Sequence, residues 1–69
     1  MTVGTFTAIV RKEGDIYVAE CPEVGTVSQG STIEEAISNL KEATELYLEE
    51  FGSPQYGQPL LTTFQAKYA

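Results

Sequence analysis

The sequence predicts an α+β domain with the order strand, strand, strand, helix, strand (β-β-β-α-β). Apolar and polar side chains alternate before residue 30, which is typical of strands. Apolar residues recur with the helical period between residues 33 and 51, and alternation returns after residue 60. We therefore expect a three-stranded antiparallel meander, one long helix that covers one face of it, and a C-terminal strand.

Turn residues separate the first three strands. Gly14 can take the positive φ of a tight turn, so the first two strands should form a β-hairpin. Pro22 ends the second strand because it has no backbone N–H to donate. Gly25 belongs to the next turn. The expected strands cover residues 5–11, 16–21 and 26–29.

The helix is expected from Ile33 to Phe51. The Thr32 hydroxyl can accept a hydrogen bond from the first turn, and the Glu35 carboxylate can accept one from the Thr32 N–H, which is a capping box. Gly52 is a suitable C-terminal cap. The residues expected to pack on the sheet are Ile33, Ala36, Ile37, Leu40, Ala43, Thr44, Tyr47 and Phe51.

A fourth strand is expected over residues 60–68, after a loop rich in Pro and Gly at residues 53–58. In a strand, the alternate residues of this segment would lie on one face. These are Leu60, Thr62, Phe64, Ala66 and Tyr68. The strand would either extend the sheet of its own chain or pair with another subunit.

The 69 residues predict one domain, residues 1–69, with no DNA-binding domain after it. A domain of this size has a marginal core unless disulfides, metals or association supplement it. One cysteine and no histidine exclude an internal disulfide and zinc sites built from Cys and His clusters. We expect a homo-oligomer without cofactor or metal. The lack of a signal peptide or membrane-spanning run indicates a cytoplasmic protein.

Acidic residues concentrate in the expected helix. The chain carries a net charge of −6, and residues 33–51 hold six Glu against Lys41 alone, a net −5. Nucleic-acid binding needs a basic face, so a basic protein partner fits better. The candidate partner-binding residues are Glu42, Glu45, Leu46 and Glu49. The alternative is that these glutamates form an ordinary solvated face.

The residue types argue against an enzyme. A metal-dependent nuclease needs several converging carboxylates, but Asp15 is the only Asp and falls in a predicted turn. Glu20 is the best remaining acidic candidate. Cys21 is expected to be a small strand residue, because no base lies at a recognisable spacing from it.

Several short pieces of sequence, in this order, resemble the HicB antitoxin family. They are Tyr17-Val18-Ala19, Pro22-Glu23, Ser28-Gln29-Gly30, Thr32 to Ala36, Asn39 to Ala43, and Tyr47-Leu48. The resemblance covers nearly all of residues 5–50. The loop at residues 22–26 is one residue shorter than is usual in the family, and Thr26 stands where Cys is common.

The resemblance implies a partial ribonuclease-H-like fold that works by binding. HicB antitoxins sequester HicA, a small basic ribonuclease that cleaves mRNA, so a HicA-like toxin is the expected partner. Longer HicB proteins carry a C-terminal DNA-binding domain; here we expect no direct binding to nucleic acid. The alternative function is a homo-oligomeric interaction protein of the same fold without a toxin.

Overall fold

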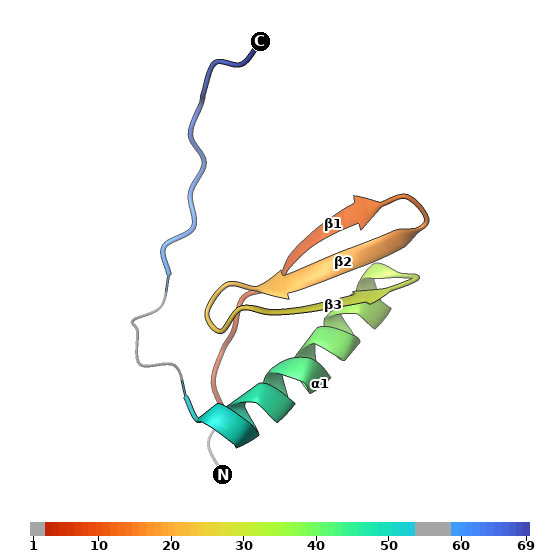
Figure 1. Cartoon of the computed structure of the whole chain (residues 1–69), viewed down its shortest axis with the longest axis vertical. Coiled ribbons are helices and arrows are strands. Elements are labelled where there is room, and N and C mark those ends of the chain that lie inside the picture. Colours follow the sequence, from red (N-terminus) through yellow and green to blue (C-terminus); the bar gives the residue numbers. More distant parts are fainter. Residues whose placement is uncertain (1–2, 54–58) are drawn as a thin grey trace.

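The computed structural model describes residues 3–53 and 59–69. Its order is β1 (Ile9–Glu13), β2 (Ile16–Cys21), β3 (Thr26–Gly30) and α1 (Ile33–Phe51). The strands form one antiparallel sheet in the order β1-β2-β3, and α1 lies across one face of it (Figure 1). The prediction of an α+β meander covered by one long helix is confirmed.

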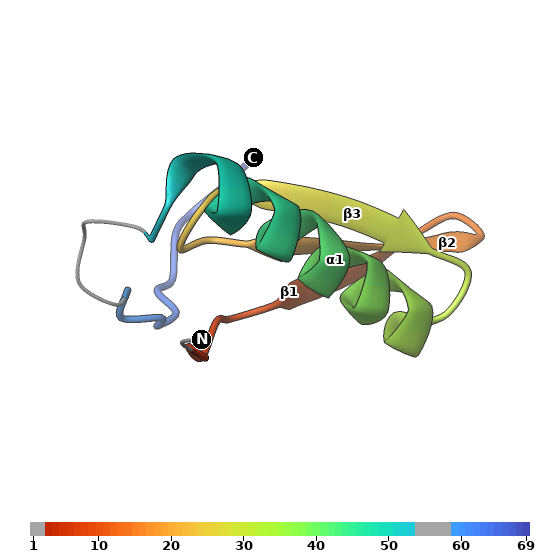
Figure 2. The same ribbon diagram turned by 90° about the horizontal axis from the view of Figure 1, so that it is seen from below.

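The register explains which side chains meet the helix. Ala19 of β2 pairs with Val10 of β1 and with Ser28 of β3, so these three side chains share the face under α1. Cys21 lies two residues from Ala19 on the same face. The opposite face of the sheet has no layer over it in the described part of the chain (Figure 2).

The core is small. Its buried apolar residues are Ala19, Cys21, Ala36 and Leu40. Thr44 is also buried, and its hydroxyl oxygen lies 2.7 Å from that of Thr26, so this polar pair satisfies itself. Gly30 brings β3 against the first turn of α1, where a Cβ atom would lie 2.6 Å from the Ala36 amide nitrogen.

The predicted start of the first strand was wrong. β1 begins at Ile9 rather than at Thr5. The Thr7 N–H donates to both carboxylate oxygens of Glu23, at 3.0 and 3.1 Å. A side chain therefore takes the place of a strand partner at this position, and the alternation of residues 5–8 does not produce a ladder.

The helix begins and ends as predicted, but its buried stripe is narrower than expected. Ala36, Leu40 and Thr44 are buried. Four of the residues expected to pack on the sheet are exposed by a third or more: Ile33, Ile37, Tyr47 and Phe51. A sheet of three short strands is too narrow to cover the whole apolar side of a helix. The Tyr47 and Phe51 rings contact each other instead, with centroids 4.8 Å apart.

The expected fourth strand is not found. Residues 59–69, here named the C-terminal arm, have no helix or strand, and all of them are exposed. The arm runs away from the sheet and helix (Figure 1). Its alternating sequence has no strand beside it among residues 3–53 and 59–69.

Candidate partner-binding surfaces

The termini of α1 fix where the acidic residues point. The Thr32 hydroxyl accepts a hydrogen bond from the Glu35 N–H at 3.0 Å, as predicted. The return bond differs from the prediction: the Glu35 carboxylate accepts from the Ser31 N–H at 3.0 Å, one residue earlier than Thr32. At the other end, Gly52 has φ 78° and donates to the Leu48 carbonyl.

The structure brings the predicted partner-binding residues together on the outer side of α1. Glu42, Glu45 and Glu49 are all exposed and follow each other at helical spacing. Leu46 is 61% exposed and borders Glu42 and Glu49. We name these four residues the acidic face. Leu46, its one apolar side chain, is exposed to solvent in the single chain.

No carboxylate of the acidic face forms a salt bridge within the described residues, and the one cation beside them on α1 is Lys41. The salt bridge in that part of the chain joins Arg11 to Glu20, with the nitrogen and oxygen 3.1 Å apart, on the sheet face opposite α1. The carboxylates of Glu42, Glu45 and Glu49 outnumber Lys41 and give this side of α1 a net negative charge. This arrangement suits a basic protein surface and disfavours phosphate groups.

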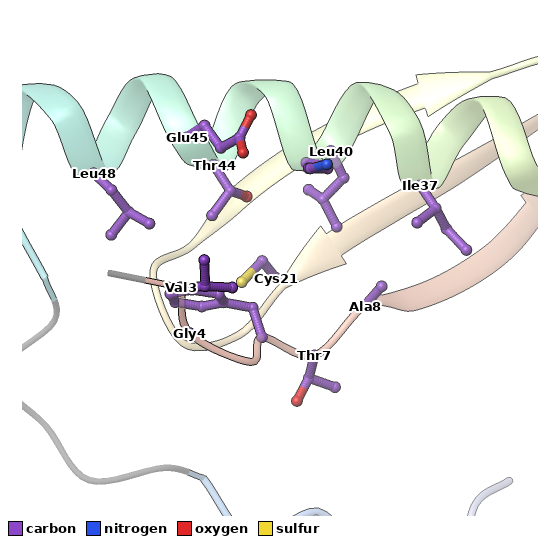
Figure 3. Close-up of a pocket in the computed structure, with 12 residues that line it drawn as sticks. Val3, Gly4, Thr7, Ala8, Cys21, Ile37, Leu40, Thr44, Glu45 and Leu48 are labelled. Atoms are coloured by element: carbon purple, nitrogen blue, oxygen red, sulfur yellow. The ribbon is translucent and has the colours of Figure 1, made fainter. Parts of the chain in front are cut away.

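A groove that the sequence analysis did not identify lies between α1 and the segment before β1. Its volume is about 350 Å³. Ile37, Leu40 and Leu48 point into it from α1, and the Cys21 sulfur lies between the helix and that segment (Figure 3). Val3 and Phe6 line the other side. The sequence feature that points to this groove is Ile37. It lies at the edge of the apolar stripe of α1, which is wider than the sheet can cover.

Glu23 holds the segment that forms one wall of this groove. Besides the Thr7 N–H, its carboxylate accepts from the Thr7 hydroxyl at 2.6 Å and from the Cys21 thiol at 3.3 Å. Burial raises the pKa of Glu23, but these hydrogen bonds and one from its own N–H outweigh it. The net pKa lies below the ordinary 4.5. From the sequence alone, Glu23 was expected only as part of the loop at residues 22–26.

The candidate catalytic residues do not converge. Asp15 lies in the β1–β2 turn and Glu20 lies five residues along, about 16 Å away in an extended strand. Among the described residues no group of three acidic, Cys or His side chains could hold a metal ion. The same part of the chain contains no helix with the length and apolar character needed to cross a membrane.

Curated relatives match stretches of 42 to 46 residues of this chain. The chain is 52% identical over 46 residues to the UPF0150 protein ssr1765 of Synechocystis, a match that covers 64% of this chain and 58% of that protein. It is 44% identical over 46 residues to the UPF0150 protein ssr1258 of the same organism, covering 65% and 67%. A UPF0150 protein of Helicobacter pylori is 50% identical over 42 residues, covering 59% and 58%.

The chain thus spans less than two thirds of the length of two of these relatives. No family model matches the sequence. No solved structure matches it either. The family assignment rests on the UPF0150 protein ssr1258, because the match covers about two thirds of both chains. The chain belongs to the UPF0150 family.

Proposed function

We propose that this protein is a HicB-like antitoxin that binds and inhibits a small basic ribonuclease of the HicA type. One observation carries the proposal: the acidic face surrounds an exposed leucine with unpaired carboxylates within the described residues. Charges of one sign attract an oppositely charged partner over a distance, and an apolar residue among them can hold the partner once water is excluded. The resemblance to HicB supplies the class of partner.

The proposal describes a binding protein and not an enzyme. It requires no cofactor or metal and no direct contact with nucleic acid, since the toxin is the species that touches mRNA. It also places the protein in the cytoplasm, where mRNA is cleaved. An operator-specific gel shift by the purified chain at physiological salt would contradict this part of the proposal.

The alternative is a homo-oligomeric interaction protein without a toxin. The observation that favours it is the amount of apolar side chain left exposed at Ile37 and along the C-terminal arm. A short reading frame beside this one that encodes a basic, His-containing protein would favour the antitoxin. Such a protein is also the reagent for the test.

The test is the kinetics of binding to that basic ribonuclease at low and physiological salt. Glu42→Lys/Glu49→Lys should slow association about tenfold at low salt and less at physiological salt, because screening shortens the range of the charges to about 8 Å. Adding Glu45→Lys should deepen the loss. Leu46→Asp should instead speed dissociation about tenfold, with little dependence on salt.

Matched controls separate position from total charge. Glu13→Lys/Asp15→Lys also changes the net charge from −6 to −2, but at the β1–β2 turn. Val27→Asp introduces the same carboxylate at a residue of similar exposure, 58%, on the sheet. If the controls weaken ribonuclease inhibition as much as the variants of the acidic face, the toxin does not bind that face.

A further inference from the structure

We propose that the C-terminal arm of one copy binds the groove and the β1 edge of a second copy. The arm would add a strand beside β1 and place Leu60, Phe64 and Tyr68 against the flank of α1 that lines the groove. This inference requires no toxin, so its failure would leave the proposed antitoxin function open.

The arm has the composition of an amphipathic strand, but it pairs with no strand in the part of the chain that the structure describes. Three of its apolar side chains are nearly fully exposed: Leu60 by 90%, Phe64 by 87% and Tyr68 by 96%. They lie at even spacing, which in a strand puts them on one face. A segment with this pattern becomes stable when its backbone pairs with a sheet edge and its apolar face is covered.

The chain offers one sheet edge that suits this segment. β1 and β3 are the edges of the sheet. At β3, the Asn39 side-chain amide donates to the Gln29 carbonyl at 2.8 Å, and α1 crosses closely over Gly30. The β1 edge lies on the side away from this contact, and the chain that leads into β1 is itself a wall of the groove.

The edge and the groove together form a site of the right length and chemistry. A strand of nine residues is about 30 Å long, so it would run past the five residues of β1 and along the groove. The groove presents Ile37, Leu48 and Phe6 to apolar side chains. Its lining holds one cation, Lys41, and one carboxylate, Glu45, which is opposite in charge to Lys67, the one charged side chain in residues 59–69.

The exposed area argues for a second copy. The chain exposes 5961 Å², whereas a compact protein of 7.5 kDa exposes roughly 4,200 Å². The excess, roughly 1,700 Å² per chain, is ample for one side of a stable interface, which is about 800 Å². Two copies that exchange arms reciprocally form a closed twofold dimer, so no site remains open for further growth.

Two variants of the full chain, mixed together, test the inference. Ile37→Asp damages the groove and leaves the arm intact, while Phe64→Asp does the reverse. Sedimentation equilibrium at micromolar concentration should give a dimer for the unchanged protein and monomers for each variant alone. An equimolar mixture should recover dimers, because the intact arm of the Ile37→Asp chain can bind the intact groove of the Phe64→Asp chain.

A mixture that stays monomeric would overturn the inference, as would a monomeric unchanged protein. Loss of the dimer in Val27→Asp would assign the interface to the open sheet face instead. Circular dichroism checks that each variant folds. As a second measurement that does not depend on disruptive charges, chains with Ile37→Cys and chains with Phe64→Cys are mixed under oxidising conditions, each with Cys21→Ala because the Cys21 thiol lines the same groove. A disulfide-linked species of about twice 7.5 kDa that forms in the mixture and not in either variant alone supports exchange between copies, and its absence contradicts it.

Discussion

Gly30 is the position where the sequence most directly controls how the helix meets the sheet. A Cβ atom there would lie 2.6 Å from the Ala36 amide nitrogen and 2.9 Å from two atoms of Glu35. Ordinary contacts begin near 3.4 Å, so Gly30→Ala must push the first turn of α1 away by roughly 0.8 Å. The atoms in the way include helix backbone, which cannot rotate aside as a side chain does.

The cost of Gly30→Ala follows from two opposing effects. Overpacking against backbone costs about 1–3 kcal/mol, and the shift also strains the hydrogen bond from the Glu35 N–H to Thr32. Replacing glycine lowers the entropy of the unfolded chain, which returns about 0.4–1 kcal/mol. We expect a net loss of about 2 kcal/mol, or a fall in Tm of about 8–16 °C for a domain of this size.

The assay is thermal unfolding followed by far-ultraviolet circular dichroism, at one fixed protein concentration because association shifts Tm. Gly4→Ala is the matched control. Its Cβ would meet the tip of the Phe6 ring at 3.2 Å, a side chain that can move, in an exposed segment. We expect that variant to stay within about 0.5 kcal/mol of the unchanged protein. A Gly30→Ala protein as stable as the control would refute the close-approach argument.

Three further substitutions test the core, the helix cap and the Glu23 hydrogen bonds by the same melts. Leu40→Ala should cost about 2–3 kcal/mol, since it removes the largest aliphatic side chain of a small core; a smaller effect than that of Thr32→Ala would contradict this. Thr32→Ala should cost about 1 kcal/mol, and Thr32→Ser should restore most of it. Glu23→Gln should cost about 1 kcal/mol near neutral pH, discounted for partial exposure. Because the folded pKa of Glu23 lies below 4.5, the difference from the unchanged protein should be full above that pH and shrink as the pH falls; a pH-independent difference would exclude the carboxylate as its cause.

The sequence predicted the elements whose signals are local. The Thr32 cap, the Gly52 terminus and the glycine turns each depend on residues that are neighbours in the chain, and the structure has them at those places. The start of β1 could not be found this way. It depends on a carboxylate 16 residues away, Glu23, that competes for the Thr7 amide.

The same distinction between local and long-range signals applies to the candidate binding surfaces. Exposure of Glu42, Glu45, Leu46 and Glu49 followed from helical periodicity and needed no knowledge of the sheet. The groove depends on the width of the sheet and on where α1 crosses it. Neither can be predicted from the sequence of the helix alone. Ile37 therefore looked like a core residue, whereas it is 41% exposed and lines the groove.

The two proposed interfaces can be occupied together because they lie on opposite sides of one helix. Ile37 and Leu46 are nine residues apart, and at about 100° per residue they point in opposite directions. A second copy bound at the Ile37 flank therefore leaves Leu46 open to a basic protein. Glu45 borders both surfaces, since it lines the groove and belongs to the acidic face. If both proposals hold, Glu45→Lys should weaken dimerisation as well as toxin association, whereas Glu49→Lys should affect toxin association alone.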